Sequence, residues 1–472
     1  MAVKRLRFAQ RRKTAGLTQE GLADVLGLDR STVVRWERAE TEPQPWLWPK
    51  LAVALKVTPE ALAELLADII ELPDDRGGLV LVSTVPLDFS VSRSHTVKVM
   101  EGFSAHDVAS RREVLAHLSI WNGVALLGSI RGWSAALPLL PASDGQVGAD
   151  EVAELEQAVR LFRRWDASGS GGLRRKAVVG QFHAVAENLQ ERHSPEVTKR
   201  LFVITAELAQ LAGWMSYDQG LFGVAQRYYL LGLHACREAA APALGAKIIG
   251  DMVQLSTALG RYEDSLDLAH TALYSLPRAG SALVRSELLG LEARAYAQLG
   301  SGEAANAARA SETCVEVWHE ASAQPAPDWI HYMNKAEVDC LAANAYIELA
   351  LQDGTGSLQR HYAQQAERYT IGACASRGPA YTRSRIFDEI RLAKVRVAQA
   401  EPAEAAEVAM RSLALAEHTR SSLVIDWLVR FHGVLISRYP DLVEVASFDN
   451  QLREHVRSIA PVREAELDHA DR

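Results

Sequence analysis

Three glycines that stand forty residues apart, Gly220, Gly260 and Gly300, mark an internal repeat in this chain. Each glycine separates two stretches with a helical pattern, and the three segments around the glycines align with one another. A small residue follows five positions after each glycine, at Ala225, Ser265 and Ala305. Small side chains at such points let two antiparallel helices approach closely. The repeat therefore predicts stacked helix pairs, since a single pair cannot bury its apolar face alone.

This pattern resembles the tetratricopeptide repeat, with a period of forty residues in place of the usual roughly 34. Weaker copies follow at 336–368 and 385–418. In the last copy Glu401 takes the turn position and Ala406 the small one. The resemblance implies an α-solenoid of tetratricopeptide-like helical hairpins over residues 195–460. The alternative is a set of alanine-rich helical hairpins without a superhelix.

The same resemblance implies a concave face that is lined by the first helix of each pair. This groove would combine both charges with amides and aromatic rings, which suits a peptide or a polar small molecule. For each side chain the alternative is a solvated helix face. The candidate groove residues are Glu207, Gln210, Trp214, Tyr217, Lys247, Gln254, Glu287, Arg294 and Asn344.

The length of 472 residues is too great for one hydrophobic core and predicts two or more domains. Helix-breaking residues cluster at 73–78, and a β-leaning stretch follows them up to residue 103. We therefore expect an all-α chain with a linker between its two main parts. The expected segments are a first domain at 1–72, the linker at 73–103, a helical connecting region at 104–194, the repeats at 195–460 and a tail at 461–472.

Residues 17–43 predict two short helices that are joined by a tight turn. Thr18 is a favoured N-cap for the first helix, and Gly27 suits the left-handed conformation that ends it. Asp29 caps the second helix, which runs to about Arg38. The residues expected on its outer face are Arg30, Ser31, Thr32 and Arg35. A helix of this size in this arrangement fits the major groove of DNA.

The beginning of the chain is basic, whereas the remainder is acidic. Residues 4–13 contain six lysines and arginines and no acid. Residues 1–50 carry a formal charge of +4, and since the whole chain carries −8, the other residues carry −12. A phosphate backbone would be attracted to the basic end and repelled by the remainder. The alternative is a solvated charged helix face.

Both short helices resemble the phage-repressor-type (Xre) helix-turn-helix family. The matching positions are Gln19, Glu20, Leu22, Ala23, Gly27, Arg30, Ser31, Thr32, Val33, Arg35, Trp36, Glu37 and Arg38. The resemblance implies a five-helix domain over about residues 4–70 and a packed ion pair between Arg12 and Glu37. Two independent surface charges are the alternative for that pair.

From this resemblance we expect a double-stranded DNA operator as the partner of the first domain. Arg30 and Arg35 stand where some repressors have glutamines, and arginine favours O6 and N7 of guanine. An ordinary amphipathic helix pair with solvated arginines is the alternative. The expected DNA-contacting residues are Arg11, Arg12, Gln19, Arg30, Ser31, Thr32, Arg35 and Arg38.

Enzymatic, metal-binding and membrane functions find little support in the sequence. Neither a phosphate-binding loop nor a zinc-protease or nucleophile-elbow motif occurs, so we expect no catalytic residue and no cofactor. His183 and Glu187 lie four positions apart without a second histidine, and none of the four cysteines forms a C-x-x-C pair. The apolar stretch 114–140 is interrupted by polar residues, which favours a buried helix over a membrane span.

Together these features predict a cytoplasmic, nucleoid-associated regulator of transcription that reads an operator as a homodimer and senses a peptide or small molecule on its repeats. The fusion resembles bacterial regulators that join an Xre-type domain to tetratricopeptide repeats. Abundant arginine and alanine with little lysine point to the actinobacterial type, since they fit a GC-rich genome. The alternative is an interaction scaffold, which DNA binding tethers while the repeats hold a protein partner.

Overall fold

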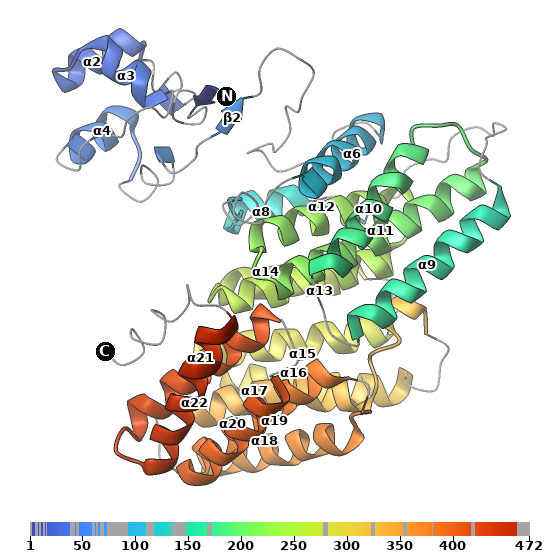
Figure 1. Cartoon of the computed structure of the whole chain (residues 1–472), viewed down its shortest axis with the longest axis vertical. Helices are drawn as coiled ribbons and strands as arrows, with labels where there is room; N and C mark the ends of the chain where they lie inside the picture. Colours follow the sequence, from blue (N-terminus) through green and yellow to red (C-terminus); the bar gives the residue numbers. More distant parts are fainter. Residues whose placement is uncertain are drawn as a thin grey trace. The chain divides into compact units, whose positions relative to one another are not determined.

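The computed structural model describes the chain in stretches that are separated by gaps. The described residues are 2–4, 8, 11–12, 15, 17–37, 43, 47–58, 62, 65–66, 70–72, 93–109, 118–131, 133–134, 148–167, 172–276, 282–321, 326–352, 356–379, 381–416 and 421–459. They fall into two compact units, residues 1–85 and residues 86–472. Figure 1 shows that the described part is almost entirely helical, as the sequence predicts.

The first unit is built on three helices with defined ends, α2 (Gln19–Leu26), α3 (Arg30–Glu37) and α4 (Trp48–Leu55). Further helical residues lie before α2, at 8 and 11–12, and after α4, at 62 and 65–66. A short antiparallel pair of strands, β1 (Ala2–Lys4) and β2 (Ile70–Leu72), joins the two ends of the unit. This strand pair was not expected from the sequence, because each strand spans only three residues and has no regular alternation.

Local capping explains where α2 and α3 begin and end. The hydroxyl of Thr18 accepts a hydrogen bond from the backbone N–H of Gly21, 2.9 Å away, at the start of α2. Gly27 has φ 71° at its end, in the left-handed region that glycine enters without strain. Asp29 accepts a hydrogen bond from the backbone N–H of Ser31 at 2.7 Å. Hydrogen bonding from the Ser31 side chain, and next from this backbone N–H, lowers the pKa of Asp29. These three capping predictions are confirmed.

The second unit begins with helices that pack against one end of a longer array. They are α6 (Arg93–Ala109), α8 (Gly123–Ile130), α9 (Ala149–Ala167) and α10 (Gly172–Asn188). The expectation of a linker up to residue 103 is wrong for its last part, which is helical. Val97, Met100 and Phe103 lie on one side of α6 and are buried, and such burial outweighs the weak β-preference of residues 93–103.

Six consecutive helix pairs follow in the described residues. They are α11 (Pro195–Asp218) with α12 (Phe222–Glu238), α13 (Pro242–Ala258) with α14 (Tyr262–Ser275), α15 (Ala282–Leu299) with α16 (Ala304–Ala321), α17 (Lys335–Leu351) with α18 (Ser357–Ser376), α19 (Thr382–Ala398) with α20 (Pro402–Ala416), and α21 (Ser422–Arg438) with α22 (Val443–Ile459). Figure 1 shows the pairs stacked one after another from green to red. Short 3-10 turns precede α16 (η2, Ser301–Glu303) and α17 (η3, Asp328–Ile330).

The turns inside the pairs follow the predicted glycines. Gly220, Gly260 and Gly300 have φ of 74°, 74° and 108°, in the region that favours glycine. Ala225 and Ser265 are fully buried where the paired helices meet, as expected. The expectation for Ala305 is wrong, because the 3-10 turn η2 delays the start of α16 and Ala307 takes the buried position instead.

Helix α21 lies along the C-terminal ends of the first helices of earlier pairs. The guanidinium of Arg430 donates to the carbonyl of Ala258, the last residue of α13, at 2.8 Å. The guanidinium of Arg438 donates in the same way, at 2.8 Å, to Leu351 at the end of α17. A cation near the unpaired carbonyls of a helix C-terminus is favourable, because that end carries partial negative charge. These contacts hold the last helix pair against helices that precede it by many residues.

Candidate functional site

Helix α3 presents a polar face to solvent from a firmly packed position. Val33 and Trp36 on its inner side are 0% and 2% exposed, and they belong to the core of the first unit. Arg30, Ser31 and Arg35 are exposed, and Thr32 is half-buried. The helical period therefore separates the packing residues from the predicted DNA-reading residues, as the sequence predicts. Arg38 lies outside the described residues.

A buried ionic cluster fixes α3 against the helices before it. Arg12 Nε lies 2.7 Å from Glu37 Oε1, so the predicted ion pair is confirmed. The amide of Gln19 donates to the other carboxylate oxygen of Glu37 at 2.6 Å. Arg12 also donates to the carbonyl of Leu17 at 2.6 Å. With a side chain only 6% exposed, Arg12 positions α3, and a direct phosphate contact by this residue stays a prediction.

Arg11 also has partners inside its own unit. Its Nε donates to the carbonyl of Leu55 at 2.8 Å, and its Nη2 donates to the carbonyl of Lys56. These carbonyls end α4, and Lys56 has φ 53°, in the left-handed conformation of a C-cap. Arg11 thus caps α4 through Nε and Nη2. A phosphate contact would have to use the N–H donors of its guanidinium that do not take part in these two bonds.

Several of the predicted groove residues are held in polar contacts within and between neighbouring first helices. Gln210 on α11 donates to Asp251 on α13 at 2.7 Å. Lys247 on α13 lies 2.5 Å from Asp251 and 3.5 Å from Glu287 on α15. The hydroxyl of Tyr332 donates to Glu287 at 2.5 Å. This chain of buried polar contacts ties three successive pairs together and occupies much of the expected binding face.

Burial governs the electrostatics of that chain. It raises the pKa of Glu287 to about 7, while the ammonium of Lys247 and the hydrogen bond from Tyr332 oppose the rise. The nearby carboxylate of Asp251 adds to it. Glu287 is therefore a carboxyl that takes up a proton near neutral pH.

The remaining groove residues divide between further pairs and a pocket. Glu207 accepts from Arg163 at 3.0 Å, and Asn344 accepts from Arg391 at 2.8 Å. Gln254 is half-buried. Trp214 packs on Tyr217, with ring centroids 5.5 Å apart.

The partner residues Arg163, Asp251 and Arg391 were not expected from the sequence. For some of these pairs, the spacing of the two residues in the sequence could have predicted the contact. Gln210 and Asp251 lie 41 residues apart, and Lys247 and Glu287 lie one repeat period apart. Complementary polar residues at the repeat period would therefore have indicated contacts between adjacent first helices.

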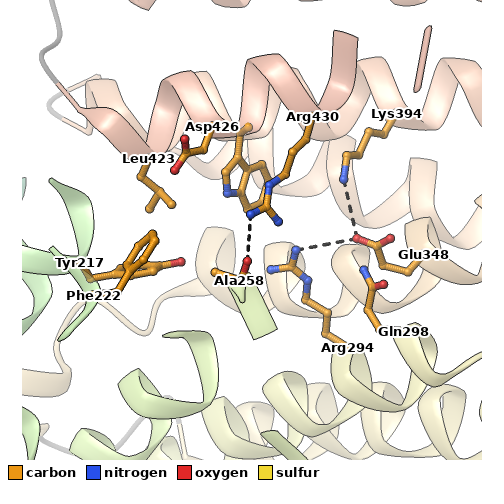
Figure 2. Close-up of a pocket in the computed structure, with 11 residues that line it drawn as sticks. Tyr217, Phe222, Ala258, Arg294, Gln298, Glu348, Lys394, Leu423, Asp426 and Arg430 are labelled. Atoms are coloured by element: carbon orange, nitrogen blue, oxygen red, sulfur yellow. Dashed lines mark hydrogen bonds and ion pairs between the residues drawn. The ribbon is translucent and has the colours of Figure 1, made fainter. Parts of the chain in front are cut away.

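A pocket of about 130 Å³ lies between α21 and the C-terminal halves of the first helices. Figure 2 shows Tyr217, Phe222 and Leu423 gathered at one end, and Arg294, Gln298, Glu348 and Lys394 at the other. Of the predicted groove residues, Tyr217 and Arg294 line this pocket. Trp214 does not line it, although its ring contacts that of Tyr217. The pocket joins residues from five first helices, the start of α12 and α21, so no single repeat contains it.

No group of histidine, cysteine, aspartate and glutamate side chains in the described residues could hold a metal ion. Cys236, Cys314 and Cys340 are buried free thiols, and Cys374 is half-buried. No helix of the described stretches combines the length and the apolar character that crossing a membrane requires.

Comparison with known proteins places the first unit in a class. Residues 8–62 match the helix-turn-helix family HTH_3, and this range contains α2, α3 and α4. None of the curated proteins matches the chain. Together with the exposed polar face of α3, the match shows a helix-turn-helix domain of the kind found in DNA-binding regulators. The matched range does not include the helix pairs of the second unit.

Proposed function

We propose that this protein is a sequence-specific regulator of transcription that binds an operator through α3 and senses a ligand on its helical array. The single observation that supports operator reading best is the exposed face of α3 within the matched helix-turn-helix domain. Arg30 and Arg35 on that face carry donors that suit the O6 and N7 acceptors of guanine. Ser31 and Thr32 lie on the same turn and are suited to phosphate or base-edge contacts.

The proposal includes a homodimer that the helical array holds together. One helix-turn-helix covers only a half-site, and two half-sites about one helical turn apart reach the usual affinity through avidity. A dimer also gives the array a means of acting on DNA. A ligand that changes the geometry of the array changes the spacing of the two reading heads, and it shifts their fit to a fixed operator by its differential affinity.

A binding-site selection with the full chain and random double-stranded DNA tests operator reading. We expect one enriched sequence with guanine in each half-site. On that sequence Arg35→Ala should lose roughly 1–3 kcal/mol of binding free energy and relax the preference at one base pair. Arg360→Ala, which removes an exposed arginine on α18, is the control and should bind as the unchanged protein does. Selection that enriches no sequence, or equal losses for both variants, contradicts the proposal.

The second candidate is an interaction scaffold whose repeats hold a protein partner while DNA binding tethers it. The internal pairing of Gln210, Lys247 and Glu287 favours it, because side chains that bind one another are less available to a small ligand. DNA affinity that changes with an added ligand supports the sensor. Constant affinity together with a protein that co-purifies with residues 86–472 supports the scaffold.

A further inference from the structure

Two cations that face the pocket beneath α21 lack hydrogen-bond partners. Among the residues that the structure describes, neither Arg294 nor Lys394 donates a hydrogen bond, and Arg294 Nε is buried without an acceptor. Both share the carboxylate of Glu348, at 3.8 Å and 3.7 Å, which is beyond hydrogen-bond distance. A guanidinium and an ammonium together offer eight N–H donors and no acceptor, so this end of the pocket has a large excess of donors.

The charges around the pocket are also unbalanced. Three cations and two acids line it, but Arg430 is exposed and already donates to the carbonyl of Ala258. The part-buried cations are Arg294 and Lys394, which share the single carboxylate of Glu348. Burial lowers the pKa of Lys394, and the neighbouring arginines lower it further, while Glu348 opposes them. A charge that has lost water is stabilised by a partner of opposite sign, and an added anion would pair with the second of these two cations.

An aromatic ring keeps the cations in place. Arg294 and Lys394 lie over the ring of Trp427, with their charged groups 5.4 Å and 5.6 Å from its centroid. Such contacts stabilise cations that have lost water, and they restrict where the charges can go. Arg294 and Lys394 are therefore held at the pocket, with side chains that are still 24% and 17% exposed.

The opposite end of the pocket is apolar. Tyr217, Phe222 and Leu423 form it, as Figure 2 shows. The rings of Tyr217 and Phe222 lie 5.9 Å apart. The volume of about 130 Å³ compares with the cavity of about 150 Å³ that holds one benzene molecule in an engineered protein. The pocket thus has room for a small apolar body, up to about the size of one ring. The charged group of such a ligand would lie at the end formed by Arg294 and Lys394.

We infer that this pocket binds a small organic acid, with its carboxylate between Arg294 and Lys394 and its apolar body against Tyr217, Phe222 and Leu423. A carboxylate has only acceptors, so it complements both donor groups, and its negative charge would pair with the two cations that otherwise share Glu348 alone. The inference rests on the sensing role proposed above and names the class of ligand for it. Because α21 forms one wall and the first helices form the other, the ligand would tie the last pair to the earlier ones.

Calorimetric titration of the full chain in the absence of DNA tests this inference. The probes are benzoate, phenylacetate and hexanoate, each beside its neutral amide. At least one acid should bind at millimolar concentrations or below, and roughly tenfold or more tightly than its amide, because the amide lacks the charge. No binding by any of the three acids, or equal binding of acid and amide, overturns the inference.

Substitutions locate the site. Lys394→Met keeps the apolar stem against Trp427 and removes the charge, and Arg294→Gln removes the second cation. Each should weaken acid binding roughly tenfold or more. Arg411→Gln, on the exposed side of α20, is the control and should leave binding unchanged. Circular dichroism confirms that each variant is folded. Acid binding that survives both substitutions in folded protein places the site elsewhere and overturns the inference. The acid-against-amide comparison uses the unchanged chain and holds whether or not a variant folds.

A separate DNA titration distinguishes this inference from the proposed function. If an acid binds at this pocket and operator affinity does not respond, the pocket stands and the sensing role fails. If operator affinity responds to a ligand but none of the acids binds, the sensing role stands and the assigned ligand class fails.

Discussion

At the scale of single residues, Glu37 connects α3, the helix that we expect to contact DNA, to the segments that precede it. Its two carboxylate oxygens accept hydrogen bonds from Arg12 and from Gln19, which belong to segments before α3 in the chain. Gln19 also accepts a longer contact, 3.4 Å, from Arg30 on the exposed face. A single buried carboxylate is therefore connected, through Gln19, to a residue that we expect to touch DNA.

Removal of this carboxylate should loosen the first unit. Glu37→Ala leaves the buried guanidinium of Arg12 unpaired, and we expect a loss of roughly 3–5 kcal/mol in the stability of the unit. Native-state hydrogen exchange of the backbone amides in α2 and α3 measures this change in the full chain. Asp24→Ala removes an exposed carboxylate from α2 and serves as the control. If these amides were equally protected from hydrogen exchange in both variants, the structural role assigned to Glu37 would be wrong.

At the scale of helices, close approach within a pair depends on residues without a side chain. A Cβ on Gly213 in α11 would lie 2.4 Å from the ring of Tyr229 in α12. Tyr229 is fully buried, so its ring has little room to move. This contact explains why the two helices of the first pair can pack so closely.

Gly213→Ala should consequently destabilise the second unit by about 1–3 kcal/mol, because the ring must shift in a packed core. Gly180→Ala is the matched control, since it also lies within a helix, α10, but has open space around it. There the gain in helix propensity should stabilise by roughly 0.5–1 kcal/mol. Urea unfolding followed by circular dichroism measures both changes. We expect the free energy of unfolding to fall in Gly213→Ala and to rise in Gly180→Ala. A change in the same direction in both variants would contradict the close packing described for α11 and α12.

The contact between α13 and α15 predicts a dependence of stability on pH. Glu287 has a folded-state pKa of about 7, above its value of roughly 4.3 in an unfolded chain. The folded state therefore binds more protons between these values, and the contribution of Glu287 to stability falls as pH rises through this window. Glu287→Gln removes the titrating group. Urea unfolding at a series of pH values measures the free energy of unfolding. Between pH 4.5 and 7 this free energy should fall more steeply with pH in the unchanged chain than in Glu287→Gln. Identical slopes would show that another group titrates there.

At the scale of the whole molecule, the described residues form two compact units. Whether DNA binding and dimerisation belong to different units can therefore be tested. We expect DNA reading to belong to residues 1–85 and dimerisation to residues 86–472. A fragment of residues 1–85 should be monomeric in light scattering and should bind the selected DNA far more weakly than the full chain, since avidity is lost. The full chain is the control and should scatter as a dimer. A dimeric fragment, or a monomeric full chain that binds equally well, would refute this arrangement.

Much of the fold could be predicted because its signals are local. Thr18, Gly27 and Gly220 begin or end helices through bonds and backbone angles that involve only a few neighbouring residues, so the sequence around them is sufficient. The exposed face of α3 follows from the helical period alone. The Arg12–Glu37 pair was predicted through a resemblance, since the local sequence does not show which distant charge lies nearby.

Other features depend on contacts between distant segments, and only the tertiary structure decided them. The position of α6 follows from burial against other helices, and the displaced small residue at Ala307 follows from a turn that the repeat pattern does not show. Arg294 and Lys394 are separated by a hundred residues, yet one pocket and one carboxylate unite them. The sequence alone thus determined the helices and the outward face that we expect to read DNA. The pocket beneath α21 and polar pairs such as Glu207–Arg163 and Asn344–Arg391 required the folded chain, because each arises where helices meet that no local pattern connects.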